Sequence, residues 1–225
     1  VRFDEEGWVL ATGEEFIRTA LTEGHHIAYV KVTDAAGNYL ERAVNFTVDT
    51  IAPTVAFVSP EDGAFVNSST GTVEWATDEG SSSVRVDGGE WTQRGSFTNW
   101  TYSLDDGEHT IEVMVTDQAG NSASAMLNIT VDTTAPTAEY SPIGDDLDID
   151  QVVRVEFSEA MNKTSVSIFL GVSGTVSWQG NAATFTPSHL LYNTEYSVNV
   201  TGKDLAGNLI ELNWTFSTML VGNIT

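Results

Sequence analysis

The chain carries the segment Val115-Thr116-Asp117-Gln118-Ala119-Gly120-Asn121 three times, and this repetition determines its architecture. The earlier copy is Val32-Thr33-Asp34-Ala35-Ala36-Gly37-Asn38, and the later copy ends in Asp204-Leu205-Ala206-Gly207-Asn208. Each copy separates two runs in which apolar and polar residues alternate, as they do in β-strands. The Asp can bond to the turn backbone and the Gly supplies a left-handed residue, so each copy predicts a β-hairpin turn. Three copies predict three related domains.

The repeat extends well beyond the turn. Residues 1–50 match residues 84–133 at a constant offset of 83, without a gap. We therefore divide the chain into unit 1 (residues 1–50), unit 2 (residues 51–133), unit 3 (residues 134–218) and a tail (residues 219–225). In this register unit 1 corresponds only to the C-terminal part of unit 2.

Unit 2 has the pattern of a complete β-sandwich. Its alternating segments predict strands, with turn signals between them, at residues 72–77, 83–86, 99–104, 108–116 and 124–131. About seven short strands in roughly 80 residues are typical of such a sandwich. Short linkers containing Ala-Pro-Thr enter unit 2 at Ala52–Thr54 and unit 3 at Ala135–Thr137. Because Pro stiffens each linker, we expect few orientations between neighbouring units.

The composition supports an all-β chain and excludes several classes of function. Val, Thr and aromatic residues fill the periodic segments, and no apolar run approaches the roughly 18 residues of a membrane helix. Lys and Arg number 9 against 32 Asp and Glu, a net charge of −23, which argues against nucleic acid as a partner. The chain has no cysteine, so disulfides, thiolate metal sites and cysteine nucleophiles are excluded.

Unit 1 is expected to be incomplete, since nothing in it matches residues 51–83. Half a sandwich leaves an apolar face open and strand edges unpaired. One explanation is that the chain is a segment of a longer protein. The other is that a neighbouring subunit donates the missing strands, for which the tail Met219–Thr225 is a candidate donor.

Glycosylation sequons are more frequent than chance predicts. Eight of the 13 Asn residues begin an Asn-x-Ser/Thr triplet, where about three are expected. Within the predicted strands these residues alternate with apolar ones and so fall on the outward face. The pattern predicts a secreted, glycosylated surface; a Thr- and Asn-rich strand face without glycans is the alternative. The eight candidates are Asn45, Asn67, Asn99, Asn128, Asn162, Asn199, Asn213 and Asn223.

Several segments of unit 3 resemble those of a known protein family. It contains Val153–Asn162, Ala183–Pro187, Thr194-Glu195-Tyr196, Asp204–Asn208 and Phe216-Ser217-Thr218, and in these it resembles the prokaryotic Ig-like modules of S-layer and other surface proteins. Units 1 and 2 look like the tandem Ig-like repeats of bacterial and archaeal adhesins. The resemblance implies tandem immunoglobulin-like β-sandwich domains, with an S-layer type of module in unit 3, and an extracellular or cell-surface location. It does not separate stalks, spacers and binding heads.

Calcium is the one cofactor that these residues suggest. Related adhesin repeats can hold Ca²⁺ at domain junctions, and oxygen-bearing side chains suit this hard cation. The matching residues are Asp34, Asn38 and Asp49 at the first junction, and Asp117, Asn121 and Asp132 at the second. The alternative is that Asp and Asn serve only the hairpin turn. The acidic run Asp145–Asp150 is a second candidate, against the alternative of a solvated loop.

The His and Trp residues are expected to be structural. His26, His109 and Tyr196 align, and an Ig-type sandwich often keeps a Tyr at this corner that bonds to nearby backbone. No catalytic residue and no enzymatic activity are therefore predicted. Three Trp are expected in the core and three near turns, where a sugar platform is the alternative. The core group is Trp75, Trp100 and Trp214, and the turn group is Trp8, Trp91 and Trp178.

Together these features predict a non-catalytic extracellular stalk of tandem Ig-like modules on a prokaryotic cell surface. Two alternatives remain: a subunit of a filament or S-layer assembled by strand complementation, and an accessory carbohydrate-binding module of a secreted enzyme. The expected partners are other surface proteins, like subunits or glycans, with no nucleic acid and no membrane insertion.

Overall fold

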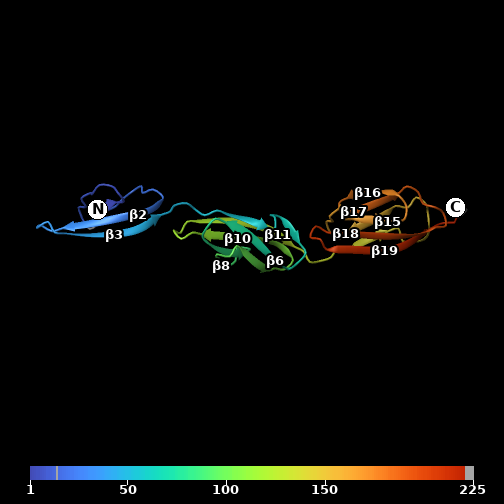
Figure 1. The fold of residues 1–225 in the computed structure, drawn as a ribbon. Helices are drawn as coiled ribbons and strands as arrows, with labels where there is room; N and C mark the ends of the chain where they lie inside the picture. Colours follow the sequence, from blue (N-terminus) through green and yellow to red (C-terminus); the bar gives the residue numbers. More distant parts are fainter. Residues whose placement is uncertain (14, 221–225) are drawn as a thin grey trace.

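The structure is a computed structural model that describes residues 1–13 and 15–220. All regular secondary structure in these residues is β-strand, and the three units follow one another along one direction, from the blue unit 1 to the orange and red unit 3 (Figure 1). The predicted all-β fold with tandem sandwiches is confirmed. Two expectations, the sequon at Asn223 and a donor strand in the last five residues of the tail, lie outside the described residues.

Unit 2 is a sandwich of two sheets with eight strands in all. The larger sheet has the order β5-β11-β10-β7-β8, and the smaller one has the order β4-β6-β9. Strands β4, β5 and β8 lie outside the five strand ranges that were predicted from the sequence. The strands are β4 (Val55–Ser59), β5 (Ala64–Val66), β6 (Thr70–Thr77), β7 (Ser81–Val86), β8 (Thr92–Gly95), β9 (Asn99–Ser103), β10 (Gly107–Thr116) and β11 (Ser122–Val131).

The core of unit 2 follows from the alternation in its strands. Val113 and Val115 of β10 point inward and are fully buried, and they pack in one cluster with Val73 and Trp75 of β6. The residues between them on each strand face outward, as a period of two requires.

Unit 3 is a second sandwich of eight strands, with four in each sheet. The orders are β12-β14-β17-β16 and β13-β19-β18-β15. Its core includes Val155, Val198 and Phe216, all fully buried. The strands are β12 (Ala138–Ser141), β13 (Gly144–Leu147), β14 (Val153–Phe157), β15 (Ser167–Phe169), β16 (Gly174–Gln179), β17 (Ala182–Pro187), β18 (Glu195–Lys203) and β19 (Leu209–Thr218).

Unit 1 is a single sheet of three strands. Strands β1 (Arg2–Phe3), β2 (Gly24–Thr33) and β3 (Tyr39–Val48) form the order β1-β2-β3. Among the described residues of unit 1 only His26 is buried. The expectation of an open apolar face in this unit is therefore confirmed.

Each repeated segment forms the predicted hairpin turn. The turns join β2 to β3, β10 to β11 and β18 to β19. Their glycines Gly37, Gly120 and Gly207 have φ values of 89°, 100° and 101°, which lie in the left-handed region that glycine adopts without strain. Across the described part of the chain there is no helix of the length and apolar character needed to cross a bilayer.

Candidate site at the domain junctions

The carboxylate of the turn Asp organises each hairpin turn. In the turn after β18, Asp204 accepts hydrogen bonds from the backbone N–H groups of Gly207 (2.6 Å) and Asn208 (2.9 Å). Its other oxygen accepts a bond of 2.8 Å from the Asn208 side-chain amide. Asp117 and Asn121 make the same side-chain bond at 2.8 Å. The turn Asp and Asn are thereby held in fixed positions.

The turns of units 2 and 3 also bind the linker that enters their own unit. The side-chain amide of Asn121 donates a hydrogen bond of 3.0 Å to the backbone carbonyl of Asp49. At the next junction the Asn208 amide donates one of 2.8 Å to the carbonyl of Asp132. The two junctions therefore share one geometry, in which a turn receives the linker from the preceding unit.

This arrangement corrects the expected grouping of residues at the junctions. Asp34 and Asn38 do not meet Asp49, because the ten-residue strand β3 separates their turn from the linker. At about 3.3 Å per residue such a strand spans roughly 33 Å, so the turn and the outgoing linker lie at opposite ends of the unit. Asp49 meets Asp117 and Asn121 instead.

The second junction shows the same correction. Asp132 was expected to lie with Asp117 and Asn121, but strand β11 separates them. It lies with Asp204 and Asn208 of unit 3.

Three carboxylates converge at each junction. Asp49, Glu79 and Asp117 each offer an oxygen within 4.8 Å of the others, and Asp132, Glu159 and Asp204 do the same at the second junction. The turn residues Asp117 and Asp204 are buried. Each group combines a linker residue, a turn residue and a loop Glu that sequence reasoning missed.

The pKa values of the two junction Glu residues are raised by desolvation and, beyond that, by the charges around them. Burial raises the pKa of Glu79, and the charges of Asp49 and Asp117 raise it further. The pKa of Glu159 is raised by burial and by the charges of Asp132 and Asp204.

The turn Asp of unit 2 behaves in the opposite way. Burial alone would raise the pKa of Asp117, but the hydrogen bonds from Asn121 and Gly120 outweigh it and lower the pKa. At neutral pH the site therefore concentrates negative charge on oxygens that a hard cation can bind.

Glu79 and Glu159 lie in loops that are equivalent in units 2 and 3, because the residue before each Glu makes the same contact with the linker. The backbone N–H of Thr54 donates to Asp78 (2.7 Å), and that of Thr137 donates to the Ser158 hydroxyl (3.0 Å). In each case the Glu is the next residue. One feature of the sequence could have identified these residues. Glu79 lies two positions after the end of β6, and Glu159 lies two positions after the end of β14.

The linkers are also held by the unit that they leave. In the first linker the Thr50 backbone N–H donates to Glu23 (3.0 Å). In the second, the Thr133 backbone N–H donates to Asp106 (3.1 Å). Glu23 and Asp106 are equivalent at the offset of 83. Each linker is therefore bonded to the units on both of its sides, which restricts its motion.

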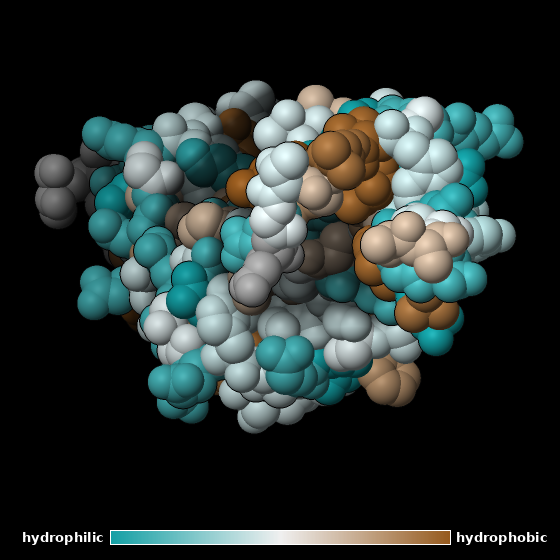
Figure 2. All heavy atoms as spheres, turned by 90° about the vertical axis from the view of Figure 1, so that its left-hand side faces the viewer, coloured by the Kyte–Doolittle hydropathy of each residue, from teal (hydrophilic) through white to brown (hydrophobic). Residues whose placement is uncertain are grey.

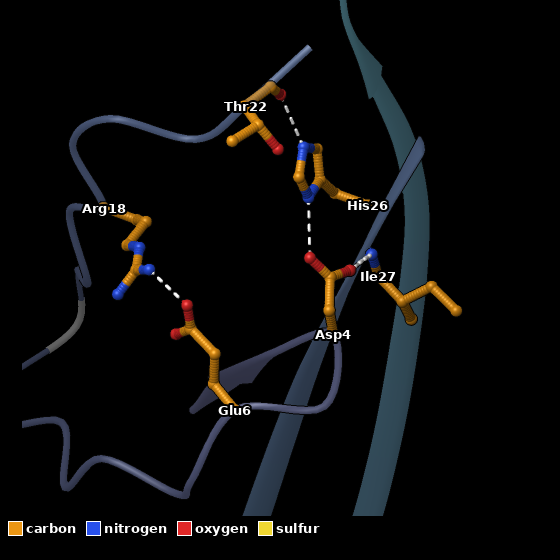
Figure 3. A network of polar contacts seen from close by, with 6 residues as sticks. All are labelled: Asp4, Glu6, Arg18, Thr22, His26 and Ile27. Carbon is orange, nitrogen blue, oxygen red and sulfur yellow. Dashed lines mark hydrogen bonds and ion pairs between the residues drawn. The ribbon is translucent and has the colours of Figure 1, made fainter. Parts of the chain in front are cut away.

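The predicted structural corner is confirmed in all three units. His26 Nε2 lies 2.7 Å from the Thr22 carbonyl and its Nδ1 lies 2.7 Å from the Asp4 carboxylate (Figure 3). His109 makes the same pair of contacts with Asp105 and Asp87 at 2.9 and 2.8 Å. Both partners of each ring are acceptors, so both ring nitrogens donate and the imidazolium form is favoured.

The corner geometry also bears on catalysis and on the third unit. The bond from Asp4 raises the pKa of His26, and neither ring nitrogen is left to act as a general base. In unit 3 the Tyr196 hydroxyl fills the corner and accepts a bond of 2.7 Å from the Leu191 N–H. The Asp–His pairs are thus architectural contacts.

The described sequon residues lie mostly at the surface. All are exposed except Asn199, which is half-buried and donates a bond of 2.7 Å to Asn213. The exposed ones are Asn45, Asn67, Asn99, Asn128, Asn162 and Asn213.

The Trp residues differ in part from expectation. Trp75 is buried, whereas Trp100 and Trp214 are half-buried against the two cores. Trp8 is exposed, but Trp178, expected near a turn, stacks on Phe157 of the core. The described residues therefore do not assemble the turn-group Trp into one planar platform.

The acidic run Asp145–Asp150 lies partly in a strand and partly in the turn that follows it. Residues Gly144–Leu147 make up β13, and the Asp145 carboxylate accepts a bond of 2.8 Å from the Ser217 hydroxyl. Within residues 1–13 and 15–220, the groups of three close metal-binding side chains are the two at the junctions, so the acidic run does not supply one.

Two family models match the chain. Residues 128–218 match the model described as a bacterial Ig-like domain, and residues 53–133 match the one described as glucodextranase, domain B. The Ig-like sandwich fold of units 2 and 3 agrees with these matches. A search of curated proteins found no match.

Several solved structures are similar to the chain at low sequence identity. The fibronectin(III)-like modules of Clostridium thermocellum CbhA share 9% identity, with a TM-score of 0.44 over 76% of this chain and 97% of that one. The immunoglobulin domains 1–5 of Sidekick-1 share 12%, with a TM-score of 0.46 over 90% and 48%. A tetra-tandem repeat from the extending region of a large adhesion protein shares 20%, with a TM-score of 0.37 over 88% and 57%.

Proposed function

We propose that the chain is part of a semi-rigid extracellular stalk, in which Ig-like modules are held at fixed angles by their junctions. The observation that carries this proposal is the contact made twice between a turn Asn and a linker carbonyl, Asn121 with Asp49 and Asn208 with Asp132. A spacer needs junctions that resist bending, whereas a flexible tether does not. The repetition of one contact at two successive junctions supports a spacer.

The linkers support this role because each is bonded on both sides. Thr50 bonds to Glu23 behind it, and Thr54 bonds to Asp78 ahead of it. Only a few residues lie between these anchors, so few torsions remain free. Bonds of this kind contribute about 1 kcal/mol each, and their number sets the stiffness.

The surface suits an extracellular setting. The net charge of −23 keeps the chain solvated and repels nucleic acid and other anionic surfaces. Glycans attached to the exposed sequons would project into solvent, where they would not interfere with the cores. We propose a cell-surface location on these grounds.

Calcium is proposed to stiffen the junctions. Each junction offers three carboxylates within 4.8 Å, drawn from the linker, a loop and the turn. A bound Ca²⁺ would relieve the repulsion that raises the pKa of Glu79 and Glu159 and would tie three segments together. Ca²⁺ should therefore raise the melting temperature, and a chelator should reverse the rise.

The distance between two spin labels tests the stalk directly. The chain has no cysteine, so Ser124→Cys in unit 2 and Ser177→Cys in unit 3, both exposed, give a clean labelled pair. A stalk predicts a narrow distance distribution in Ca²⁺ that broadens in chelator. A broad distribution in both conditions would show a flexible tether and reject the proposal.

A second candidate function rests on the match of residues 53–133 to glucodextranase, domain B. A module of this kind in a carbohydrate-active protein would position the rest of that protein near a glycan. Trp91, which lies within the matched residues and is half-buried, offers a reporter for this idea. Titration with soluble polysaccharides, followed by Trp fluorescence, separates the candidates, because a pure spacer gives no saturable change.

A further inference from the structure

The exposed phenylalanines of units 2 and 3 share one kind of neighbour. Seen from the end where unit 1 lies, the molecule shows mostly hydrophilic side chains, with hydrophobic ones in separate patches (Figure 2). Among the described residues of units 2 and 3, the exposed phenylalanines are Phe65, Phe97 and Phe169, which are 45%, 65% and 65% exposed. A single exposed apolar residue is ordinary and needs no explanation. What these three have in common is a glycosylation sequon beside the ring.

Two of the rings lie next to a sequon Asn in simple ways. Phe169 of β15 is directly opposite Asn199 of β18 in the paired strands. Phe97 precedes Asn99 by two positions, and Arg94 contacts both residues. The Arg94 guanidinium lies 5.6 Å from the centroid of the Phe97 ring and donates a hydrogen bond of 3.2 Å to the Asn99 carbonyl.

The third ring, Phe65, lines a groove together with the sequon residue Asn128. The groove has a volume of about 420 Å³, which lies within the range of clefts that bind small ligands. The backbone N–H of Gly63 donates to the Asn128 carbonyl (2.8 Å), and an added Cβ at Gly63 would meet no atom within 4 Å. Because Gly63 has no side chain, open space remains between Asn128 and the ring.

The Asn128 side chain is held in an orientation that suits attachment of a sugar on the side of β5. Its Oδ1 accepts a hydrogen bond of 3.0 Å from the Thr110 hydroxyl of β10. Its Nδ2 donates a bond of 3.2 Å to Asp62, in the loop ahead of β5. An amide nitrogen carries two hydrogens, so one can be replaced by a sugar while the other keeps the bond to Asp62.

The strand register places the ring within reach of such a sugar. Phe65 lies opposite Thr130, the third residue of the sequon. Neighbouring strands are about 4.8 Å apart and rise about 3.3 Å per residue, so the Cα atoms of Phe65 and Asn128 are about 8 Å apart. A pyranose ring has a face of C–H groups, and their partly positive hydrogens are attracted to the negative face of an aromatic ring.

We propose that Phe65 is the docking platform for an N-linked glycan on Asn128, so that the groove is an intramolecular carbohydrate site. This inference rests on the glycosylated surface proposed above. In the attachment step the bond between Asn128 Nδ2 and the sugar C1 forms, and the bond from C1 to the phosphate oxygen of an activated sugar donor breaks. Nδ2 loses one proton, and the phosphate leaves with the electron pair.

The docked glycan stabilises the strand that holds the second linker. Strand β5 has three residues and lies at the edge of the five-stranded sheet. The carbonyl of its Val66 accepts a hydrogen bond of 2.9 Å from the backbone N–H of Asp132, the linker residue of the second junction. A sugar packed on Phe65 fastens β5 to β11, and it thereby contributes to the stiffness of this junction.

An attached glycan fits the groove better than a sugar free in solution. The short tether to Asn128 holds the sugar beside Phe65 at an effective concentration on the order of millimolar. A free sugar lacks this advantage and loses its translational and rotational freedom on binding, which one exposed ring offsets poorly.

Hydrogen exchange of the β5 amides tests the docking. The full 225-residue chain and its Phe65→Ser variant are each produced in a host that glycosylates sequons and in one that does not. Glycosylation should slow exchange in Ala64–Val66 by about 10-fold in the original chain and leave it unchanged in Phe65→Ser. Phe65→Tyr keeps an aromatic ring and should retain the effect.

Further variants separate the neighbouring sequons. Each is measured as the ratio between its glycosylated and unglycosylated forms, so any direct effect of the substitution cancels. Asn128→Gln should abolish the slowing in β5, whereas Asn67→Gln, at the sequon two positions after Phe65, should preserve it. Phe169→Ser removes an exposed ring of unit 3 and should also preserve it.

Four outcomes would overturn the inference. Equal slowing in the original chain and in Phe65→Ser would exclude the ring as the platform. Loss of the slowing in Asn67→Gln but not in Asn128→Gln would assign the ring to the other sequon. Glycopeptide mapping of the native protein that finds Asn128 bare and other sequons occupied would remove this inference alone, whereas bare sequons throughout would also remove the glycosylated surface. Slowing of exchange in the unglycosylated chain by free, released glycan well below millimolar concentration would make the groove a site for external carbohydrate.

Discussion

The side-chain amide of Asn208 donates a hydrogen bond of 2.8 Å to the backbone carbonyl of Asp132, which lies 76 residues earlier in the chain. The same amide donates to Asp204 at 2.8 Å, so one side chain joins the turn of unit 3 to the linker that enters it. A turn residue thereby takes part in setting the angle between two domains.

Replacing Asn208 should loosen the second junction. Asn208→Ala removes the bond to the Asp132 carbonyl and one bond to Asp204, and we expect a loss of about 1–2 kcal/mol from the stability of unit 3. The distance distribution between labels at positions 124 and 177 should broaden. Asn38→Ala is the matched control, because among the described residues the side-chain amide of Asn38 bonds only to the turn Asp34. Equal broadening in both variants would contradict the role given to the linker bond.

The Glu residues at the junctions should govern both the calcium response and the metal-free stability. The pKa of Glu79 and of Glu159 is raised in the folded chain, so the metal-free protein loses stability as the pH rises above about 4.5. Glu79→Gln with Glu159→Gln should therefore melt higher than the original chain in chelator at neutral pH. With Ca²⁺ at 100 times its Kd, the original chain should gain about 2.7 kcal/mol and the variant much less. Equal calcium responses in both would exclude these carboxylates as ligands.

The corner of unit 2 should make stability depend on pH. The bond to Asp87 raises the pKa of His109, so its contribution is complete below about pH 6.5 and is lost as the pH rises through the folded value. His109→Gln should reduce the fall in melting temperature between pH 6 and pH 9. His189→Gln serves as the control, since this exposed His bonds, among the described residues, only to its neighbour Ser188. The corner assignment fails if both variants keep the full pH dependence.

Several of these features could be predicted from the sequence because each is local. The Asp-x-Ala-Gly-Asn turn, the alternating strands and the backbone contacts of the corner at His26, His109 and Tyr196 depend on residues close together in the chain. The Asp partners of the two His residues lie 22 positions away and were not predicted. The repeat at an offset of 83 also predicted the open apolar face of unit 1. Local patterns determine local structure, and here they gave the sandwich architecture.

The junction could not be read in the same way, because its partners are distant in the sequence. Asp49 meets Asp117 across 68 positions, and no periodic pattern connects them. The length of β3 alone should have excluded Asp34 as a partner of Asp49. Glu79 and Glu159 were missed because unit 1 has no counterpart of their loop, so the repeat offered no third example for comparison.

Gly80 should be required at the first junction. Its φ is +87°, and an added Cβ would lie 2.7 Å from the Thr116 carbonyl oxygen and 2.8 Å from Val115 Cγ1. Gly80→Ala should cost about 1–3 kcal/mol from strain at this position and weaken the calcium response by shifting Glu79. Gly88→Ala is the control. Gly88 also has a positive φ, +70°, but an added Cβ there would meet no atom within 4 Å. Thermal unfolding with and without Ca²⁺ should distinguish the two variants. Equal losses of stability in both would show that the close approach to the Thr116 carbonyl is unimportant.

The same substitution should destabilise one of the two equivalent hairpins strongly and the other only slightly. Val113→Asp places a carboxylate in the core beside Val73 and Trp75, where no partner is available, and we expect it to cost at least about 3 kcal/mol and to unfold unit 2. Val30→Asp changes the equivalent residue of unit 1, which is half exposed, so its cost should stay within about 0.5 kcal/mol. Near-UV circular dichroism and urea unfolding of the two variants measure the difference. If Val30→Asp were as damaging as Val113→Asp, then unit 1 would bury this face in solution, in conflict with the exposure of Val30 in the structure.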